Sequence, residues 1–290
     1  MSETLASLRH KIDGAAKLKS VVRTMKAVAA SSIGQYAAAV AALGGYEAAV
    51  AQGLGGCFRG AGEVHAAGTI RPVTGIGAVV FGSDQGLVGQ FNEQLAEFVA
   101  STLGAMPGRK VVWSVGERID GHLIASSLPP VGKFAVPLSV SAITPLVGQI
   151  QVESEAHRAR GEYVELYVFH NRPNAAGQYE PVSQRLLPLD AAWQLSLSKV
   201  PWPTKNLPEF VAGQDETLRA LIHEYLFISV YKACAESLAS ENSARLAAMQ
   251  RAEKNIDELS ADLSQSFYRL RQSSIDEELF DVLSGFKALG

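Results

Sequence analysis

The chain has 290 residues, 47% of them hydrophobic and 19% charged, which is enough for a sizeable core and two structural units. A net charge of −3 and a pI near 6.1 exclude a protein that binds nucleic acid or a charged membrane surface through bulk charge. We expect no signal peptide, because the first turn is polar, and no apolar run of the roughly 20 residues that a bilayer requires. Cys57 and Cys234 form no C-x-x-C pair, so we expect reduced thiols in a cytosolic setting.

A long helix is predicted at the N-terminus, because residues 3 to about 52 contain no proline and their apolar residues recur at steps of three and four. This period predicts an apolar seam for a partner helix, and frequent alanines between 27 and 51 predict that the seam is thin. The expected seam residues are Leu5, Leu8, Ile12, Ala15, Leu18, Val22, Met25, Ala29, Ile33, Tyr36, Val40 and Leu43. We therefore predict a coiled-coil helix over 1–58 and, where glycines gather, a linker over 59–75.

From residue 76 the sequence changes to short apolar runs, typical of buried strands, that alternate with helical segments. The predicted strands are 76–81, 110–115, 131–136, 162–171 and 182–189, and the predicted helices are 92–103, 117–127 and 143–160. This alternation favours a Rossmann-like α/β domain over 76–213 with a largely parallel sheet, in which the last two strands form a hairpin. Several prolines predict an irregular link over 190–213.

A second long helix is predicted from 214 to 284, about 71 residues without glycine or proline and roughly 105 Å long. Its apolar residues alternate steps of three and four, which predicts a left-handed coiled coil within a C-terminal segment over 214–290. The expected seam is Ile228, Tyr231, Ala235, Leu238, Met249, Ala252, Ile256, Leu259, Leu263, Ser266 and Leu270. Asn242 and Arg245 fall midway in this seam, where they either fix the register or mark looser packing.

The α/β insert closes the connection between the long helices at one end, so we expect the helices to pair antiparallel. The second helix is longer by about 20 residues, so about 30 Å of it should extend past its partner. The end of this extension is apolar, which implies a socket in another protein. The apolar residues are Phe280, Val282, Leu283, Phe286 and Leu289.

Residues 83–89, Ser-Asp-Gln-Gly-Leu-Val-Gly, lie between a predicted strand and a predicted helix, where phosphate-binding loops occur. Their glycines are spaced G-x-x-G, which is neither G-x-G-x-x-G nor a P-loop. We therefore favour a turn in which Ser83 or Asp84 caps a helix, over a nucleotide site.

No other stretch predicts a convincing active site. The histidines show no H-E-x-x-H spacing and no cysteine neighbours, so we expect no metal site. Glu277, Glu278 and Asp281 are expected to form a solvated helix face rather than a catalytic pair. We predict no catalytic residue, no cofactor and no metal.

The first helix has a basic surface with two possible explanations. It is either solvated, or it meets acidic loops of a surrounding partner, and basic residues of the second helix extend it in both cases. The charges are Arg9, Lys11, Lys17, Lys19, Arg23 and Lys26 on the first helix, and Arg245, Lys254, Arg269 and Arg271 on the second.

Four stretches, in order along nearly the whole chain, resemble motifs of one family. They are Met-Lys-Ala-Val-Ala-Ala at 25–30, Ser-Asp-Gln-Gly-Leu-Val-Gly-Gln-Phe-Asn at 83–92, Leu-Ala-Ser-Glu-Asn-Ser-Ala-Arg-Leu-Ala-Ala-Met at 238–249, and Asn-Ile-Asp-Glu-Leu at 255–259 with the helix that follows. This family is the γ subunit of F-type ATP synthases.

The chain departs from the family pattern at four places. Asp276 stands where the family usually has Thr, Tyr268 where it has Asn, and Gly285-Phe286 where it has Gly-Ala. Residues 31–33, Ser-Ser-Ile, replace a basic step. Together with residues 18–26, Leu-Lys-Ser-Val-Val-Arg-Thr-Met-Lys, and with Gln35-Tyr36, these features resemble the divergent γ subunits of alternate F-type (Na⁺/H⁺-translocating) ATPases that some bacteria carry beside a standard enzyme.

The resemblance implies a non-catalytic rotor shaft that couples ion flow through a c-subunit ring to ATP synthesis or hydrolysis at β subunits. The implied partners are the F1 hexamer of three α and three β subunits, the ε subunit and the c ring, with no nucleic acid. The implied location is the cytoplasmic face of a bacterial cell membrane, which the chain reaches only through partners. The implied contacts with the β catch loop and sleeve are Arg9, Met25, Arg271, Gln272 and Asp276, and the implied apolar bearing tip is Val282, Leu283, Phe286 and Leu289.

Two other functions are compatible with the residue patterns. One is an α/β nucleotide- or phosphate-binding enzyme that uses the 83–89 turn and dimerises through its helices. The other is a coiled-coil scaffold with no rotary role.

Overall fold

The computed structural model describes residues 4–60, 75–174, 178–202, 204–206, 209–211 and 213–288. Its elements are α1 (Leu5–Gly60), β1 (Gly75–Phe81), α2 (Phe91–Gly104), β2 (Arg109–Val115), α3 (Glu117–Ala125), β3 (Gly132–Phe134), the 3₁₀ helix η1 (Val140–Ala142), α4 (Ile143–Ala159), β4 (Glu165–Pro173), β5 (Tyr179–Leu187), α5 (Ala191–Ser198) and α6 (Gln214–Ala288). As predicted, the long N- and C-terminal helices pack together around an inserted, mixed α/β sheet. Most of the predicted linker lies outside the described residues.

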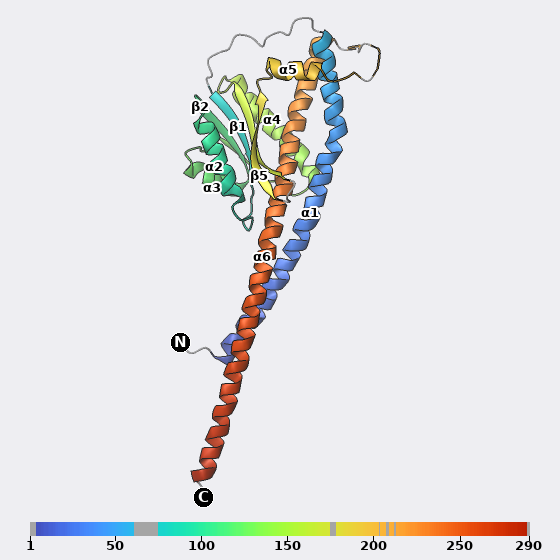
Figure 1. Cartoon of the computed structure of the whole chain (residues 1–290). Coiled ribbons are helices and arrows are strands. Elements are labelled where there is room, and N and C mark those ends of the chain that lie inside the picture. Colours follow the sequence, from blue (N-terminus) through green and yellow to red (C-terminus); the bar gives the residue numbers. More distant parts are fainter. Residues whose placement is uncertain are drawn as a thin grey trace. The chain divides into compact units, whose positions relative to one another are not determined.

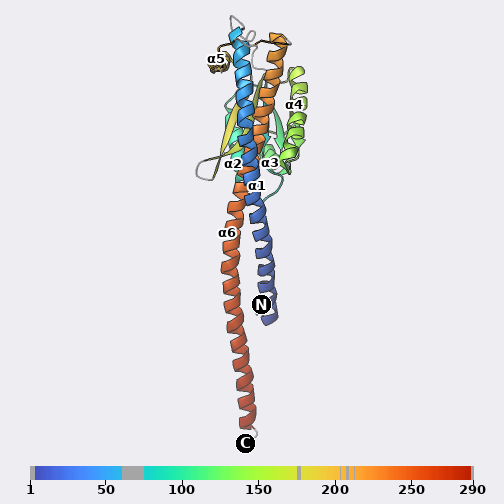
Figure 2. The ribbon, with the colours of Figure 1, turned by 90° about the vertical axis from the view of Figure 1, so that its right-hand side faces the viewer.

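The chain divides into two compact units, and both long helices contribute to each. The first unit is Met1–Ala30 with Arg245–Gly290, and the second is Ser31–Ala244. Within each unit α1 and α6 lie side by side (Figures 1 and 2).

The two helices are antiparallel in both units. In the first unit Lys19 pairs with Asp257, while Lys26, further along α1, pairs with the earlier Glu253. In the second unit Glu47 pairs with Lys232, while Gln214, at the start of α6, donates a hydrogen bond to the carbonyl oxygen of Cys57. α6 has 75 residues and α1 has 56, so the predicted difference of about 20 residues is confirmed.

The seam of α1 has a period of seven residues. In the first unit the buried positions are Leu8, Ala15, Val22 and Ala29, and the half-buried positions three residues before each are Leu5, Ile12, Lys19 and Lys26. A seven-residue period keeps the same positions facing a partner in a left-handed supercoil. The inclusion of Leu18 in the seam was wrong: this side chain is 60% exposed, and the neighbouring Lys19 takes its place.

The seam of α6 differs from the prediction in the same way. Met249 is buried, and Ile256, Leu263 and Leu270 are half-buried, as expected. Leu259 is 52% exposed and Ser266 is also exposed, so their inclusion was wrong. The half-buried positions between the apolar ones are instead Glu253, Ser260 and Phe267. Helix geometry therefore decides which positions lie in the seam, even where a more apolar residue is close by in the sequence.

Asn242 lies in the second unit, on the buried side of α6. Its side-chain amide donates a hydrogen bond to the carbonyl oxygen of Leu238, one turn earlier in the same helix, at 2.8 Å. This bond satisfies the buried amide locally, so it does not support a role of Asn242 in fixing the register.

By length and composition alone, α1 is long and apolar enough to cross a membrane. The expectation that no segment reaches this level was wrong. Within the second unit, α1 contributes Tyr36 to a core that also contains Ala233 and Cys234 of α6.

The sheet of the second unit has the strand order β3-β2-β1-β4-β5. β1 pairs in parallel with β2 and β4, β2 pairs in parallel with β3, and β5 pairs antiparallel with β4. The largely parallel sheet and its closing hairpin are confirmed. All residues of β1 are buried because both faces of the sheet are covered.

α2 and α3 cover one face of the sheet, and α4 and α6 pack on the other (Figure 1). Ile76, Ala78 and Val80 of β1 face the core with α2 and α3. The intervening Val79 and Phe81 face the core with α4 and α6. α6 thus bounds the α/β core and is also one of the two helices of the coiled coil.

A short helix, α5, occupies part of the segment that was expected to be irregular. Asp190 is its N-cap and accepts a hydrogen bond from the backbone N–H of Trp193 at 2.8 Å. Trp193 of α5 packs against Phe58 of α1 and Tyr225 of α6. The expectation of an irregular link over 190–213 was wrong here, because the prolines begin only after α5 ends.

Candidate functional site

The turn at 83–89 holds other parts of the fold in place. The Asp84 carboxylate accepts hydrogen bonds from the backbone N–H groups of Glu117 and Val136, each at 2.9 Å. Asn92 bonds both the backbone N–H of Ser83, at 3.0 Å, and its hydroxyl, at 2.9 Å. Asp84 is therefore the predicted cap, but it caps α3 and not α2, the helix that follows the turn.

Ligands in α/β sheets of this kind bind beyond the carboxyl end of the strand at which the strand order reverses, here β1. α6 closes that position, because Ser237 donates a hydrogen bond to the carbonyl oxygen of Phe81 at 3.0 Å. Ser83 crowds it from the other side, since a Cβ on Gly116 would lie 2.8 Å from the Ser83 backbone. The geometry supports the structural explanation of the turn and not a nucleotide site.

The basic surface of α1 partly serves the seam between the helices. Glu253 of α6 accepts hydrogen bonds from Arg23 Nε at 2.8 Å and from Lys26 Nζ at 2.5 Å. Lys19 pairs with Asp257, one turn further along α6. The choice between a solvated surface and a partner contact therefore missed a third possibility, an ion-pair network with the chain's own second helix. Arg9 and Lys17 are exposed.

Glu253 is the centre of this network, and only 16% of its side chain is exposed. The hydrogen bond from Arg23, followed by that from Lys26, lowers the pKa of Glu253 to about 2. The same bond raises the pKa of Arg23. The sequence contained a signal for this site. Glu253 and Asp257 are one turn apart on α6, and in antiparallel register they lie opposite three basic residues of α1, Lys19, Arg23 and Lys26.

The far end of α6 extends past its partner in the first unit. If the pairing of Lys19 with Asp257 is continued antiparallel, Leu5 lies level with Arg271. The last turns of α6 therefore have no partner from the described part of α1. Their apolar side chains lie in solvent: Ile275, Leu279, Phe280, Val282 and Leu283 are each at least 52% exposed.

The predicted contact residues lie close to this open end or along the first unit. Arg271, Gln272 and Asp276 are exposed on α6, as is Arg9 on α1, whereas Met25 is half-buried. The predicted tip residues Val282 and Leu283 are exposed. The side chain of Phe286 and all of Leu289 lie outside the described residues.

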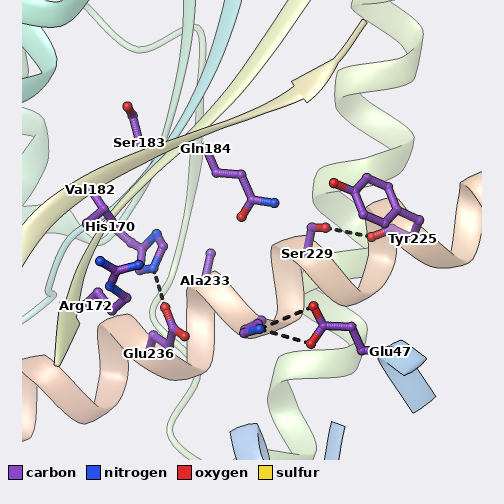
Figure 3. A pocket seen from close by; sticks show the side chains of 11 residues that line it. Glu47, His170, Arg172, Val182, Ser183, Gln184, Tyr225, Ser229, Ala233 and Glu236 are labelled. Atoms are coloured by element: carbon purple, nitrogen blue, oxygen red, sulfur yellow. Dashed lines mark hydrogen bonds and ion pairs between the residues drawn. The ribbon is translucent and has the colours of Figure 1, made fainter. Parts of the chain in front are cut away.

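A polar pocket of about 340 Å³ lies in the second unit between α1, α6 and the β4–β5 hairpin (Figure 3). His170 Nε2 lies 2.7 Å from a Glu236 carboxylate oxygen, and Lys232 Nζ lies 3.0 Å from that of Glu47. Arg172 pairs with Glu180 at 2.8 Å. Through these contacts, Lys232 of α6 is joined to Glu47 of α1, and Glu236 of α6 is joined to His170 of β4.

No metal or redox chemistry is indicated in the described part of the chain. It contains no group of three or more His, Cys, Asp or Glu that could hold a metal ion. Cys57 and Cys234 are free and buried, and burial raises the pKa of both thiols. Such thiols are poor nucleophiles.

The fold and these sites define a class of protein: a pair of long antiparallel helices with an inserted α/β unit that packs on one of them. A family model described as "ATP synthase" matches residues 4–289. The chain is 26% identical to the "ATP synthase gamma chain" of Syntrophus aciditrophicus over 98% of both chains. It is 27% identical to that of Dechloromonas aromatica over 97% of this chain and 98% of the relative.

Solved structures show the same fold. A chain of the Euglena gracilis mitochondrial ATP synthase superposes with a TM-score of 0.68 at 14% identity, over 98% of this chain and 94% of that one. A chain from the central stalk and c ring of the Tetrahymena thermophila enzyme gives 0.59 at 21% identity, over 80% and 99%. The chain belongs to the ATP synthase gamma chain family, the non-catalytic rotor subunits of the central stalk. The enzyme and the plain scaffold are thereby excluded as its function.

Proposed function

We propose that the chain is the shaft of a membrane F-type ATP synthase or ATPase, and that the open end of α6 is its working end. This proposal rests on the exposed apolar side chains near the C-terminal end of α6, where α6 extends beyond the end of α1. An apolar helix end is not stable in water by itself, so it needs a socket. Apolar contact is also non-directional, which lets the tip turn in a collar without being held at one angle.

The proposed socket is the F1 hexamer of three α and three β subunits. Arg271, Gln272 and Asp276 are exposed where the shaft would meet the β catch loop, and Arg9 and Met25 would meet the β sleeve. The Asp276 carboxylate replaces the usual hydroxyl, so we propose that the β loop facing it has changed as well. Rotation of an asymmetric shaft changes nucleotide affinity only if its contacts differ between open and closed β subunits.

We propose the following division of the chain. The coiled coil of 1–58 and 214–290 turns inside the hexamer. The α/β domain of 76–213 stands with the lower coiled coil on the c ring beside the ε subunit, and 59–75 links the first helix to this domain. The structures similar to this one include a complex described as F1 with a c ring. The chain would then be peripheral on the cytoplasmic face of a bacterial membrane, held there through its partners.

We further propose that the chain belongs to the divergent, Na⁺/H⁺-translocating branch of alternate F-type ATPases. The support is in residues 31–33 together with 18–26 and Gln35-Tyr36, and in the departures from the common pattern at Asp276, Tyr268 and Gly285-Phe286. The carboxylate that selects the ion would lie in the c ring and not in this chain.

Co-purification tests the proposed partners. An affinity-tagged chain should bring down the α, β and ε subunits in fixed stoichiometry from its own cell membranes. A tagged chain that is recovered without α and β, under conditions that preserve the c ring, would contradict the proposal.

A further inference from the structure

A second, larger pocket lies between α4 and α6, above the part of the sheet formed by β1, β4 and β5. Its volume is about 640 Å³. All of its lining belongs to the second unit. Its walls come from Gly148, Val152 and Ala156 on α4 and from Leu226 and Val230 on α6. Neither the rotor function nor the comparisons assign a role to it.

The size and chemistry of this pocket are those of a small-molecule site. Such sites occupy about 300–1,000 Å³ and are lined mainly by apolar side chains with a few polar groups. The floor is Val79, Leu166 and Leu186, all apolar. Polar side chains are few, and include Gln151, Glu155 and His223.

The hydroxyl group of Tyr163, which lines the pocket, is already satisfied. The Tyr163 hydroxyl donates a hydrogen bond to the carbonyl oxygen of Ser154 at 2.8 Å. Burial raises the pKa of Tyr163 to about 12, so the hydroxyl stays neutral. Its ring therefore adds apolar surface to the pocket without presenting a free polar group to a ligand.

Gly148 shows that space remains beside α4. A Cβ placed there would meet nothing within 4 Å, although the residue is half-buried and lines the pocket. Glycine within a helix costs about 1 kcal/mol relative to alanine. Such a glycine usually allows another element to pack closely against the helix, but no element does so at Gly148.

We propose that the α4–α6 pocket binds a neutral, apolar small molecule. A charged ligand would lose its hydration against apolar walls, and the Glu155 carboxylate at the rim is already paired with Arg158 at 3.2 Å. A bound molecule would contact α4, α6 and the sheet together. The proposal is independent of the rotor function, since it concerns only residues within the α/β unit and the part of α6 that packs on it.

The probe for the test is N-phenylnaphthylamine, a neutral fluorophore that brightens in apolar sites. The variant is Gly148→Phe, which places a ring in the pocket. The matched control is Gly121→Phe on α3, another helical glycine whose Cβ would meet nothing within 4 Å, but which is exposed and outside the pocket. If Gly148→Phe does not fold, Ala156→Phe takes its place.

Titrations use the full chain and the assembled complex. We expect the full chain and the Gly121→Phe control to show one saturable site per chain, and Gly148→Phe to bind about tenfold more weakly or not at all. Equal binding by Gly148→Phe and the control would overturn the proposal. So would the loss of the site from the wild-type complex, because a neighbouring protein would then cover the pocket.

Discussion

Arg23 Nε on α1 lies 2.8 Å from a carboxylate oxygen of Glu253 on α6, between buried turns of the coiled-coil seam. Lys26 reaches the other oxygen of the same carboxylate. One acidic residue of α6 thus holds two basic residues of α1. A slip of either helix by one turn would separate them, so the network favours the observed register.

Glu253→Gln should weaken the pairing of α1 with α6, because the amide keeps the shape but loses the charge that two cations share. We expect a lower thermal midpoint, with a smaller difference from wild type at high salt. Thermal unfolding followed by circular dichroism measures this. Glu258→Gln is the control, since Glu258 is exposed and its ion pair is with Lys254 of the same helix at 3.7 Å. Equal midpoints for the two variants would refute the role of Glu253.

The lowered pKa of Glu253 predicts an acid-sensitive contribution to stability. The pKa falls from an ordinary 4.5 to about 2 in the folded chain. The contribution is therefore complete above the unfolded pKa of 4.5 and is lost as the pH falls from about 4.5 through about 2. The difference in free energy of unfolding between wild type and Glu253→Gln should shrink across that window. A difference that stays constant down to pH 2 would contradict the assignment.

Asp84→Ala should destabilise the α/β unit by about 2 kcal/mol, because two backbone N–H groups, at Glu117 and Val136, lose their acceptor. Denaturant unfolding measures this, with the exposed Asp262→Ala as the control. Neither the wild-type chain nor the variant should bind ATP tightly in calorimetry. If wild type binds ATP tightly and Asp84→Ala does not, the turn is a nucleotide site after all.

Sequence periodicity was sufficient to predict both long helices and the alternating strands and helices of the insert up to β5, and the position of the insert between the helices predicted their antiparallel pairing. These features depend on long, uninterrupted patterns. Where local composition and geometry disagreed, the prediction failed: Leu18 is more apolar than Lys19, but Lys19 lies on the seam and reaches Asp257. A lysine can lie there because its methylene stem covers apolar surface while the ammonium group reaches an acid.

The partners of single side chains were less predictable. The 83–92 motif was apparent in the sequence, but its role depends on Val136, more than 40 residues away, and only the folded sheet brings that backbone to Asp84. The helix at Ala191–Ser198 was hidden by the prolines that follow it, although Asp190 is an ordinary N-cap signal. Pockets between α4 and α6 have no sequence pattern, because their walls come from distant segments.

The Arg271→Ala, Gln272→Ala double variant tests the proposed contact with β. Coupling energies between sites are about 1–3 kcal/mol, so the loss of both side chains should lower ATP-driven ion pumping about fivefold relative to hydrolysis. Arg219→Ala, an exposed arginine at the other end of α6, is the control. Nucleotide affinity of the separated β subunits should not change. Equal pumping by both variants would show that these residues do not make the contact.

The most direct test removes the open end of α6 by ending the chain after Leu270. This truncation retains the seam, including Glu253, Met249 and Leu263, so the isolated chain should unfold at nearly the same midpoint as the full chain. In the assembled enzyme we expect a less stable complex, or ion pumping that no longer follows ATP hydrolysis. If assembly, hydrolysis and pumping are all unchanged, the end of α6 is not the part of the shaft that works in a socket.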